Sequence, residues 1–215
     1  MQKVVIVDYG MSNLHSVYSA LEKVSNDKFD IEISQDVTAI NNCDRVVFPG
    51  QGAAKDCMHH IQALGLVDVI HKAAREKPFL GICMGMQVLL KSSEENGGTP
   101  CLGLLEGTVE AFSKTFKASS VDSHFKIPHM GWNTIQQKFD HPLWFGIEQH
   151  SYFYFVHSFF VNLACPGQSA GVTDYGIEFS SVLADGKVFA MQCHPEKSAD
   201  NGLQLLSNFL NWNGN

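Results

Sequence analysis

The sequence predicts an α/β fold: a three-layer open sheet with a mostly parallel core and an antiparallel extension. In the first half, short apolar, β-branched runs such as 4–7 and 45–48 alternate with helical patterns, as in right-handed βαβ units. From 104 to 188, strand patterns dominate. At 215 residues the chain has room for one sizeable core, so we expect a single domain over 1–215.

The first elements follow from local patterns. Residues 4–7 form a continuous apolar strand of the kind buried inside a parallel sheet. Residues 13–24 carry apolar side chains at helical spacing, and Ser12 is a suitable N-cap. Further strands are expected at 29–33 and 45–48. A helix is expected over 53–75, with a break near Gly65 left open.

The later elements include the segment that carries most of the chemistry. An apolar strand bounded by Pro78 leads to Cys83, and a helical pattern follows from 84 to 90. Residues 94–100 are expected to form a loop, and Asp185-Gly186 a tight hairpin turn. The remaining predictions are strands at 108–112, 152–161, 180–183 and 188–192, and a helix at 201–212.

Composition limits the classes of function. A formal net charge of −7 without a basic cluster argues against nucleic acid or an anionic membrane as the main partner. The first residues are too quickly interrupted for a signal peptide, and no apolar run approaches membrane-spanning length. We therefore expect a cytoplasmic protein.

Cysteine and histidine spacing gives no sign of a metal or a disulfide framework. The six cysteines lack Cys-x-x-Cys pairs, which in the cytosol indicates reduced thiols. The ten histidines, including His59-His60, lack a metal-binding spacing. We expect neither a metal nor another cofactor.

Cys83 lies where the apolar strand gives way to a helix, in the pattern Gly81-x-Cys83-x-Gly85. This pattern matches the nucleophile elbow of serine hydrolases, in which glycines accommodate a sharp turn and close helix packing. The helix dipole there favours a thiolate. The alternative is a buried core cysteine, which is the commoner fate of a cysteine in an apolar stretch.

A base for such a nucleophile is present near the carboxyl end of the chain. His194 ends an apolar strand, and Pro195 after it restricts the backbone. Glu196 can fold back to orient one ring nitrogen and leave the other for the thiol. A strand-end histidine beside an exposed Glu-Lys pair is the alternative. With Cys83 present, a Cys83–His194–Glu196 triad is the better account.

Attack by a thiolate on an amide creates an oxyanion that backbone N–H groups stabilise. We expect one donor at Met84, directly after the nucleophile. The second is expected from the loop Pro49-Gly50-Gln51-Gly52, whose glycines let the backbone approach a ligand. An ordinary turn at 49–52 is the alternative.

Together, the Gly81–Gln87 elbow, the Pro49–Gly52 loop and His194-Pro195-Glu196 resemble the class I glutamine amidotransferases, which release ammonia from glutamine through a Cys-His-Glu triad. The resemblance implies Cys83 as nucleophile, His194 as general base and then acid, and Glu196 as its orienting partner. It also implies a glutamine pocket formed by Gly52, Gln87, His157, Ser158 and Phe159.

Further motifs, at 7–14, 128–133, 154–159 and 192–198, resemble one branch of this family, whose members pass ammonia to a TIM-barrel cyclase in histidine biosynthesis. The resemblance implies such a cyclase as partner in a heterodimer. The positions that it places at the partner interface are Asn13, Met130, Trp132, Asn133 and Lys197. Core packing is the alternative for Met130 and Trp132.

The chain departs from the family pattern at three positions. Met84 replaces a commoner leucine, which is a volume-conserving change. Gln51 stands where a small apolar residue is usual, within the loop expected to supply an oxyanion donor. Cys193 stands where phenylalanine is usual. It should point away from His194 in an extended strand, and we interpret it as a smaller core residue.

Two other functions stay open at this stage. A paralogous glutaminase could supply another synthase, such as one in surface-sugar biosynthesis. A catalytically idle regulatory or binding subunit could share the fold, although packing alone does not require Cys83, His194 and Glu196 together.

Overall fold

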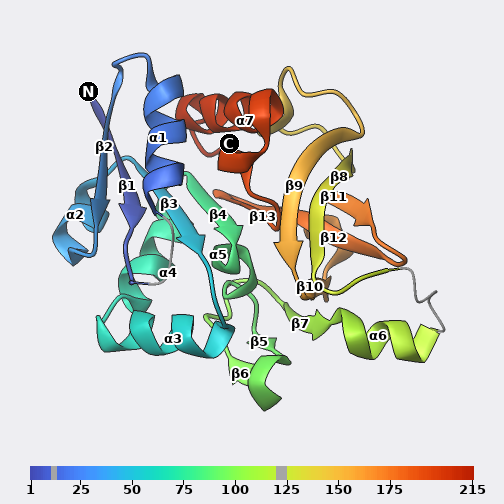
Figure 1. The fold of residues 1–215 in the computed structure, drawn as a ribbon. Coiled ribbons are helices and arrows are strands. Elements are labelled where there is room, and N and C mark those ends of the chain that lie inside the picture. The colour runs from blue at the N-terminus through green and yellow to red at the C-terminus, as the bar shows by residue number, and fades with distance from the viewer. Residues whose placement is uncertain (11–13, 120–124) are drawn as a thin grey trace.

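The computed structural model describes residues 1–10, 14–119 and 125–215, which form an α/β fold (Figure 1). Its strands are β1 (Gln2–Val7), β2 (Phe29–Ser34), β3 (Arg45–Gly50), β4 (Phe79–Cys83), β5 (Ser92–Ser93), β6 (Thr99–Pro100), β7 (Gly107–Ala111), β8 (His129–Gln137), β9 (Ser151–His157), β10 (Phe159–Leu163), β11 (Ser169–Asp174), β12 (Glu178–Asp185) and β13 (Val188–Met191). Its α-helices are α1 (Leu14–Ser25), α2 (Val37–Asn42), α3 (Ala54–Ala63), α4 (Val67–Glu76), α5 (Met84–Gln87), α6 (Phe112–Ser119) and α7 (Ala199–Asn211). The 3-10 turns are η1 (Glu95–Gly97), η2 (Pro142–Trp144), η3 (Pro166–Gln168) and η4 (Pro195–Lys197).

The centre of the sheet is parallel, with strand order β2-β1-β3-β4-β13. This is the order of flavodoxin-like sheets. Strands β12, β10 and β7 extend it by antiparallel pairing, and β11, β8 and β9 form an antiparallel branch beside β12. The predicted parallel core with an antiparallel extension is confirmed.

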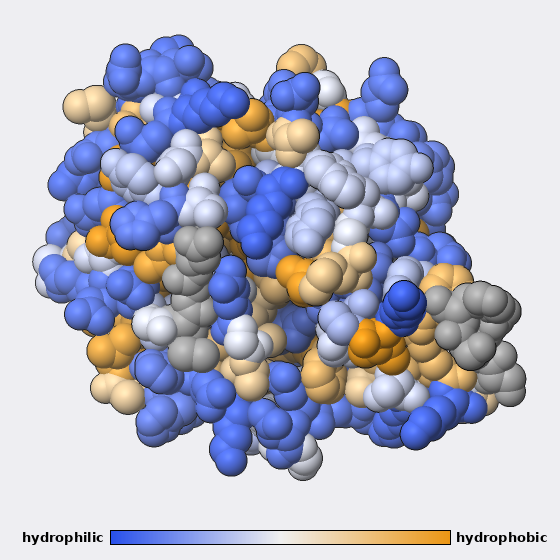
Figure 2. Space-filling view, viewed as in Figure 1, coloured by the Kyte–Doolittle hydropathy of each residue, from blue (hydrophilic) through white to orange (hydrophobic). Residues whose placement is uncertain are grey.

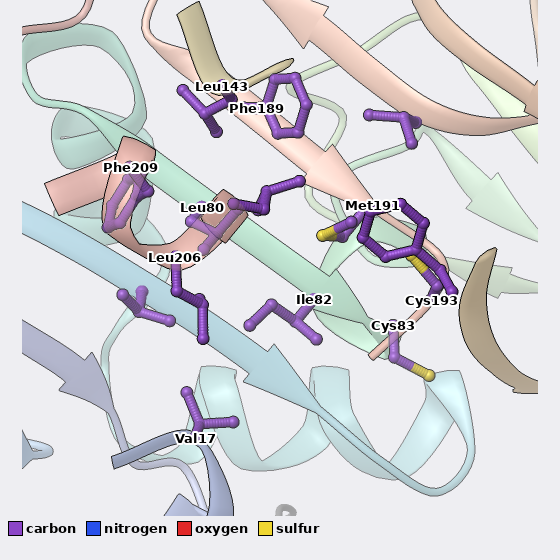
Figure 3. Close-up of a cluster of buried hydrophobic side chains, with 14 of the residues drawn as sticks. Val17, Leu80, Ile82, Cys83, Leu143, Phe189, Met191, Cys193, Leu206 and Phe209 are labelled. Atoms are coloured by element: carbon purple, nitrogen blue, oxygen red, sulfur yellow. The ribbon is translucent and has the colours of Figure 1, made fainter. Parts of the chain in front are cut away.

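Helices cover both faces of the parallel core. Val4 and Ile6 of β1 belong to one buried cluster, with residues of α1 and α7, whereas Val5 and Val7 belong to another, with residues of α3 and α4. This alternation follows from the two-residue period of a strand and produces the three layers. Figure 3 places Cys83 at the edge of the first cluster, at the end of β4. On the side of the molecular surface shown in Figure 2, apolar residues lie in small groups among polar ones.

Two of the predicted helices differ in extent from the prediction. The helix expected over 53–75 is two helices, α3 and α4, and the break near Gly65 that the sequence left open is present, with a φ of +66° at Gly65. The helix predicted over 84–90 ends at Gln87. It ends there because the carbonyls of Val88, Leu89 and Leu90 accept hydrogen bonds from backbone N–H groups of residues 102–105.

The antiparallel half differs most from the sequence prediction. The single strand predicted over 152–161 is divided at Ser158 into β9 and β10, which pair with different neighbours. The loop predicted at 94–100 contains η1 and the short strand β6. Helices α2 and α6 and strand β8 were not predicted as separate elements.

Ser12, the expected N-cap, and Asn13, an expected interface residue, lie outside the described residues. Among the residues that the structure describes, no helix is long and apolar enough to span a membrane.

Gly85 provides a direct test of the packing beneath α5. A Cβ built at this position would lie 1.8 Å from the carbonyl oxygen of Phe48 in β3, far inside van der Waals contact. We expect Gly85→Ala to lower the free energy of unfolding by about 3 kcal/mol or more, at the upper end for overpacked substitutions. Urea denaturation measures this change. Gly167→Ala is the control, because a Cβ there has no neighbour within 4 Å and should change stability little. Equal stability of the two variants would contradict the close approach of α5 to β3.

Candidate active site

Cys83 occupies a strained turn between β4 and α5. Its φ is +55° and its ψ −114°, a conformation that non-glycine residues rarely adopt. The flanking glycines permit the close packing that holds this turn. A Cβ at Gly81 would lie 2.9 Å from the Cβ of Ala190, and one at Gly85 would collide with Phe48. The turn therefore has the predicted geometry of a nucleophile elbow.

The segment after β13 brings His194 to the same edge of the sheet. The His194 N–H donates to the carbonyl of Tyr154 at 2.9 Å. The Ser198 hydroxyl donates to the His194 carbonyl at 2.6 Å and accepts from the Tyr154 N–H at 3.0 Å. Gly202 in α7 lets the turn approach, since a Cβ there would lie 1.9 Å from the Pro195 carbonyl oxygen. The turn is thus tied to both β9 and α7.

His194 and Glu196 form a buried pair. The Nδ1 atom of His194 lies 2.8 Å from Oε1 of Glu196, and both side chains are 3% exposed. Burial by itself lowers the pKa of His194, but interactions with Cys83 and Glu196 outweigh it and raise this pKa to about 10. The imidazole is therefore protonated at neutral pH. Its other nitrogen, Nε2, is buried without a hydrogen-bond partner among the described residues.

A pocket of about 360 Å³ opens over Cys83. The residues that line it come from five segments: the loop after β3, the elbow, η1, the β9–β10 junction and the His194 turn. They are Gln51, Gly52, Cys83, Met84, Gln87, Glu95, Val156, His157, Ser158, Phe159, His194 and Lys197. The pocket therefore contains all of the residues expected to bind glutamine or its oxyanion.

The loop after β3 runs beside Cys83. Gly50 pairs with Cys83 in the parallel register of β3 and β4. The Cys57 thiol donates to the Gln51 carbonyl at 3.3 Å, which turns this carbonyl toward α3. In a trans peptide the N–H points opposite to the C=O, so the N–H of Gly52 points away from Cys57. Gly52 itself has a φ of +84°, as a glycine readily adopts.

Gln87 contacts the β9–β10 junction and a second glutamine. Its Nε2 donates to Oε1 of Gln192 at 2.8 Å and to the Phe159 carbonyl at 3.3 Å. Its Oε1 is buried without a hydrogen-bond partner in the described part of the chain. Gln87 therefore lines the pocket with both amide hydrogens used within the protein and with one buried acceptor left over.

His157 forms part of a neutral histidine pair behind the pocket wall. Its Nδ1 lies 2.7 Å from the Phe159 carbonyl, which can only accept, so Nδ1 carries the proton. Its Nε2 lies 2.8 Å from Nδ1 of His129, and Nε2 of His129 lies 3.2 Å from the Asn133 amide nitrogen. Burial lowers the pKa of His157 to about 3 and that of His129 to about 4. The His157 side chain therefore supports the wall.

Of the expected interface residues that the structure describes, Met130, Trp132 and Asn133 lie in β8 and Lys197 in η4. Met130 is 61% exposed and Trp132 52%, so core packing of these two side chains is wrong. Asn133 is partly buried, and its amide also donates to the Asp174 carbonyl at 2.9 Å. Lys197 is exposed at the rim of the pocket. Cys193 is fully buried in the first core cluster, and burial raises its pKa well above the ordinary value.

Sequence reasoning missed two polar residues of the site. Gln192 precedes His194 by two positions in an extended segment, and this spacing could have identified it, because alternate residues share a face. Glu95 lines the pocket, and its carboxylate accepts from the Ala54 N–H at 2.7 Å. Glu95 was missed because residues 94–100 were predicted only as a loop. Within the described ranges, no group of three or more His, Cys, Asp or Glu residues could hold a metal ion.

Comparisons with known proteins agree with this geometry. The family model described as glutamine amidotransferase class-I matches residues 5–212. Two solved structures share the fold with a TM-score of 0.71. One, titled glutamine amidotransferase, is 16% identical, with 97% of this chain and 99% of that one covered. The other, PurLQS from Thermotoga maritima, is 18% identical, with 98% of each chain covered. The chain belongs to the class I glutamine amidotransferases.

Within this class, the similarity to one kind of subunit extends over the full length. The protein named imidazole glycerol phosphate synthase subunit HisH of Pseudomonas putida is 50% identical over 214 residues, 100% of this chain and 99% of that protein. The protein of the same name from Hydrogenovibrio crunogenus is 50% identical over 211 residues, 98% of this chain and 97% of that protein.

The raised pKa of His194 can be measured directly. In the free chain we expect its imidazole resonances to titrate near pH 10, well above the ordinary pKa of 6.5. In Cys83→Ala the sulphur is lost while burial remains, so this pKa should fall. Nuclear magnetic resonance of selectively labelled histidine would follow both proteins. Since a raised native pKa stabilises the fold below pH 6.5 and loses this effect as pH rises toward 10, the wild-type chain should also lose stability in that range. Titration of His194 below pH 7 in both proteins would contradict the pairing.

Proposed function

We propose that this chain is a glutaminase that hydrolyses L-glutamine to glutamate and ammonia and passes the ammonia to a cyclase subunit in histidine biosynthesis. The observation that carries the proposal is the buried pair of His194 and Glu196, with the free nitrogen of His194 on the side of Cys83, beneath a pocket large enough for an amino acid. In this proposal Cys83, His194 and Glu196 are the catalytic triad.

The reaction begins with the protonated His194 beside a thiolate at Cys83. The thiolate attacks the side-chain amide carbon of glutamine and forms a tetrahedral intermediate with a negatively charged oxygen. The N–H groups of Met84 and Gly52 are the proposed donors to this oxygen. The contact between Gln51 and Cys57 supports the role of Gly52, because it keeps the Gln51 carbonyl away from the site.

Because its imidazole already carries the proton, His194 acts first as a general acid and then as a general base, the reverse of the order that the family resemblance implies. Its proton goes to the leaving nitrogen, the carbon–nitrogen bond breaks, and ammonia departs from a thioester. Water next attacks the thioester while His194 takes a proton from it, and glutamate leaves with the thiolate restored. Glu196 keeps the ring oriented through Nδ1 during both steps.

The pocket offers groups of the right kind for the amino-acid end of glutamine. The carboxylate of Glu95 is an acceptor suited to the α-ammonium group, and Gln87 lines the same pocket as a further proposed contact of the amino-acid end. The backbone of His157, Ser158 and Phe159 lies at the break between β9 and β10, where strand pairing ends. We propose that backbone groups of this segment bind the α-carboxylate.

A partner subunit accords with the names of the relatives, and we propose that it is a TIM-barrel cyclase that uses the ammonia to make imidazole glycerol phosphate and aminoimidazole carboxamide ribotide. Met130 and Trp132 expose large apolar side chains, as an interface requires. Asn133 and Asn13 complete the proposed contact set. Ammonia released into water would be protonated, so a sealed contact protects it. We propose the cytoplasm as the location.

The two other functions are less well supported. A paralogous glutaminase for surface sugars would share the triad. However, the relatives that are 50% identical over nearly their full length are named as subunits of imidazole glycerol phosphate synthase. Genomic neighbours distinguish the two pathways. An idle subunit would not need the strained Cys83 turn, which costs about 1–3 kcal/mol without a catalytic use.

The nucleophile is tested by replacing Cys83. We expect Cys83→Ala to lower glutamate release from glutamine by at least about a thousandfold, since the covalent route is lost. Release is measured for the chain alone and with the cyclase of the same organism. Cys165→Ala, at an exposed cysteine away from the pocket, should leave the rate unchanged. Unchanged hydrolysis in Cys83→Ala would overturn the proposed function.

The interface is tested at Trp132. We expect Trp132→Ala to weaken cyclase binding by about thirtyfold, as for a buried aromatic anchor, and to change the stability of the free chain little. Isothermal titration calorimetry measures the affinity. Phe145→Ala is the matched control, since Phe145 is 78% exposed but lies outside β8 and β9. Equal losses in both variants would place the cyclase elsewhere.

A further inference from the structure

Two buried carboxamides connect the pocket wall to the nucleophile. Gln87 is 2% exposed and Gln192 is fully buried. Nε2 of Gln87 donates to the Phe159 carbonyl and to Oε1 of Gln192, and Nε2 of Gln192 lies 3.7 Å from Sγ of Cys83. These contacts form one continuous series from a backbone carbonyl to the reactive sulphur.

The Phe159 carbonyl fixes which end of each carboxamide donates and which accepts. A carboxamide can be turned by 180°, which exchanges donor and acceptor, so its surroundings must decide. The Phe159 carbonyl can only accept, and therefore Gln87 must turn its NH₂ group toward it. The same NH₂ group faces Gln192, which must then present its oxygen. The NH₂ group of Gln192 is consequently left facing Cys83.

The Phe159 carbonyl is itself held in place. It also accepts from Nδ1 of His157 at 2.7 Å, and His157 is fixed by its contact with His129. Two independent N–H groups thus converge on one carbonyl. A reversed Gln87 would bring two oxygens together at this carbonyl and is excluded on that ground.

An N–H donor aimed at sulphur has most effect when the sulphur is charged. A thiol is a weak acceptor, whereas hydrogen bonds to an ionised group are shorter and about twice as strong. Burial increases this difference, because Gln192 is fully buried and a hydrogen bond is stronger where the effective dielectric constant is low. The imidazolium of His194 stabilises the same sulphur by charge, and an amide adds to it without taking up a proton.

We propose that Gln192 is a further catalytic residue, whose Nε2–H donates to the Cys83 thiolate before attack and again when the thiolate leaves the thioester. The proposal rests on the proposed function, and it adds no bond or proton transfer to that reaction. Gln87 orients Gln192 through its own amide. A purely structural Gln192 would tie β13 to α5 without affecting the ionisation of Cys83.

The experiment follows the alkylation of Cys83 by iodoacetamide in the free chain, at about pH 5 to pH 10, with quantification of the Cys83 peptide by mass spectrometry. It needs neither glutamine nor the cyclase. In Gln192→Met the donor is lost and the side-chain volume is nearly kept. We expect the midpoint of the pH profile to rise by about one unit, so that alkylation near pH 7 slows about tenfold. Gln192→Asn, which keeps the carboxamide but withdraws it by one methylene, should behave in the same direction if Gln192→Met folds poorly.

Two matched variants separate the roles. Cys193→Ala changes a fully buried side chain of the same segment on the opposite face, and it should leave the midpoint unchanged. Gln87→Met removes the amide that orients Gln192 but keeps Gln192 itself. Alkylation of Cys83 in this variant should slow by less than in Gln192→Met and by more than in Cys193→Ala, while the KM for glutamine rises. Thermal unfolding confirms that each variant is folded.

An unchanged midpoint in folded Gln192→Met or Gln192→Asn would overturn the proposal. An equal rise in Cys193→Ala would also overturn it, because the effect would then reflect general packing. Either result would leave the proposed glutaminase intact, since that function is judged by glutamate release in Cys83→Ala.

Discussion

The left-handed backbone of Cys83 is the constraint on which the rest of the site depends. A non-glycine residue at a φ of +55° is held there only when its surroundings leave no alternative. Here the surroundings are close backbone packing. Gly85 lies under the Phe48 carbonyl, and a Cβ at Gly50 would lie 2.2 Å from the Tyr9 hydroxyl. Larger residues at these glycines would separate α5 from β3, and the sulphur would lose its place at the edge of the sheet.

Strand order then supplies the chemistry around this sulphur. Because β4 lies between β3 and β13, Cys83 at its end has a different neighbour on each side. The loop after β3 provides backbone groups, and the segment after β13 provides Gln192 and His194, which share a face. Antiparallel strands add the far wall of the pocket through the break at Ser158. Residues separated by more than one hundred positions meet because parallel strands end at one edge.

Sequence reasoning found the parts of the site that are marked by local pattern. The elbow around Cys83, the turn at His194 and the order of the parallel core all follow from residue type and spacing. The missed parts depend on tertiary contacts. Helix α5 is short because residues 102–105 bond the carbonyls of the three residues after it. The Gln192 amide faces Cys83 because the Phe159 carbonyl orients Gln87. Neither relation is visible until distant segments are placed together.

The neutral pair of His129 and His157 has a consequence for how the enzyme responds to its surroundings. Their pKa values are lowered to about 4 and 3, while that of His194 is raised to about 10. None of these three histidines therefore changes charge between about pH 4 and pH 10. The tautomers of His129 and His157 at the pocket wall stay constant over the same pH range. Cellular acidification therefore leaves the charges of these three imidazoles unchanged. Asn133, on the same face of β8 as His129 and opposite Met130 and Trp132, holds the outer end of this series of hydrogen bonds.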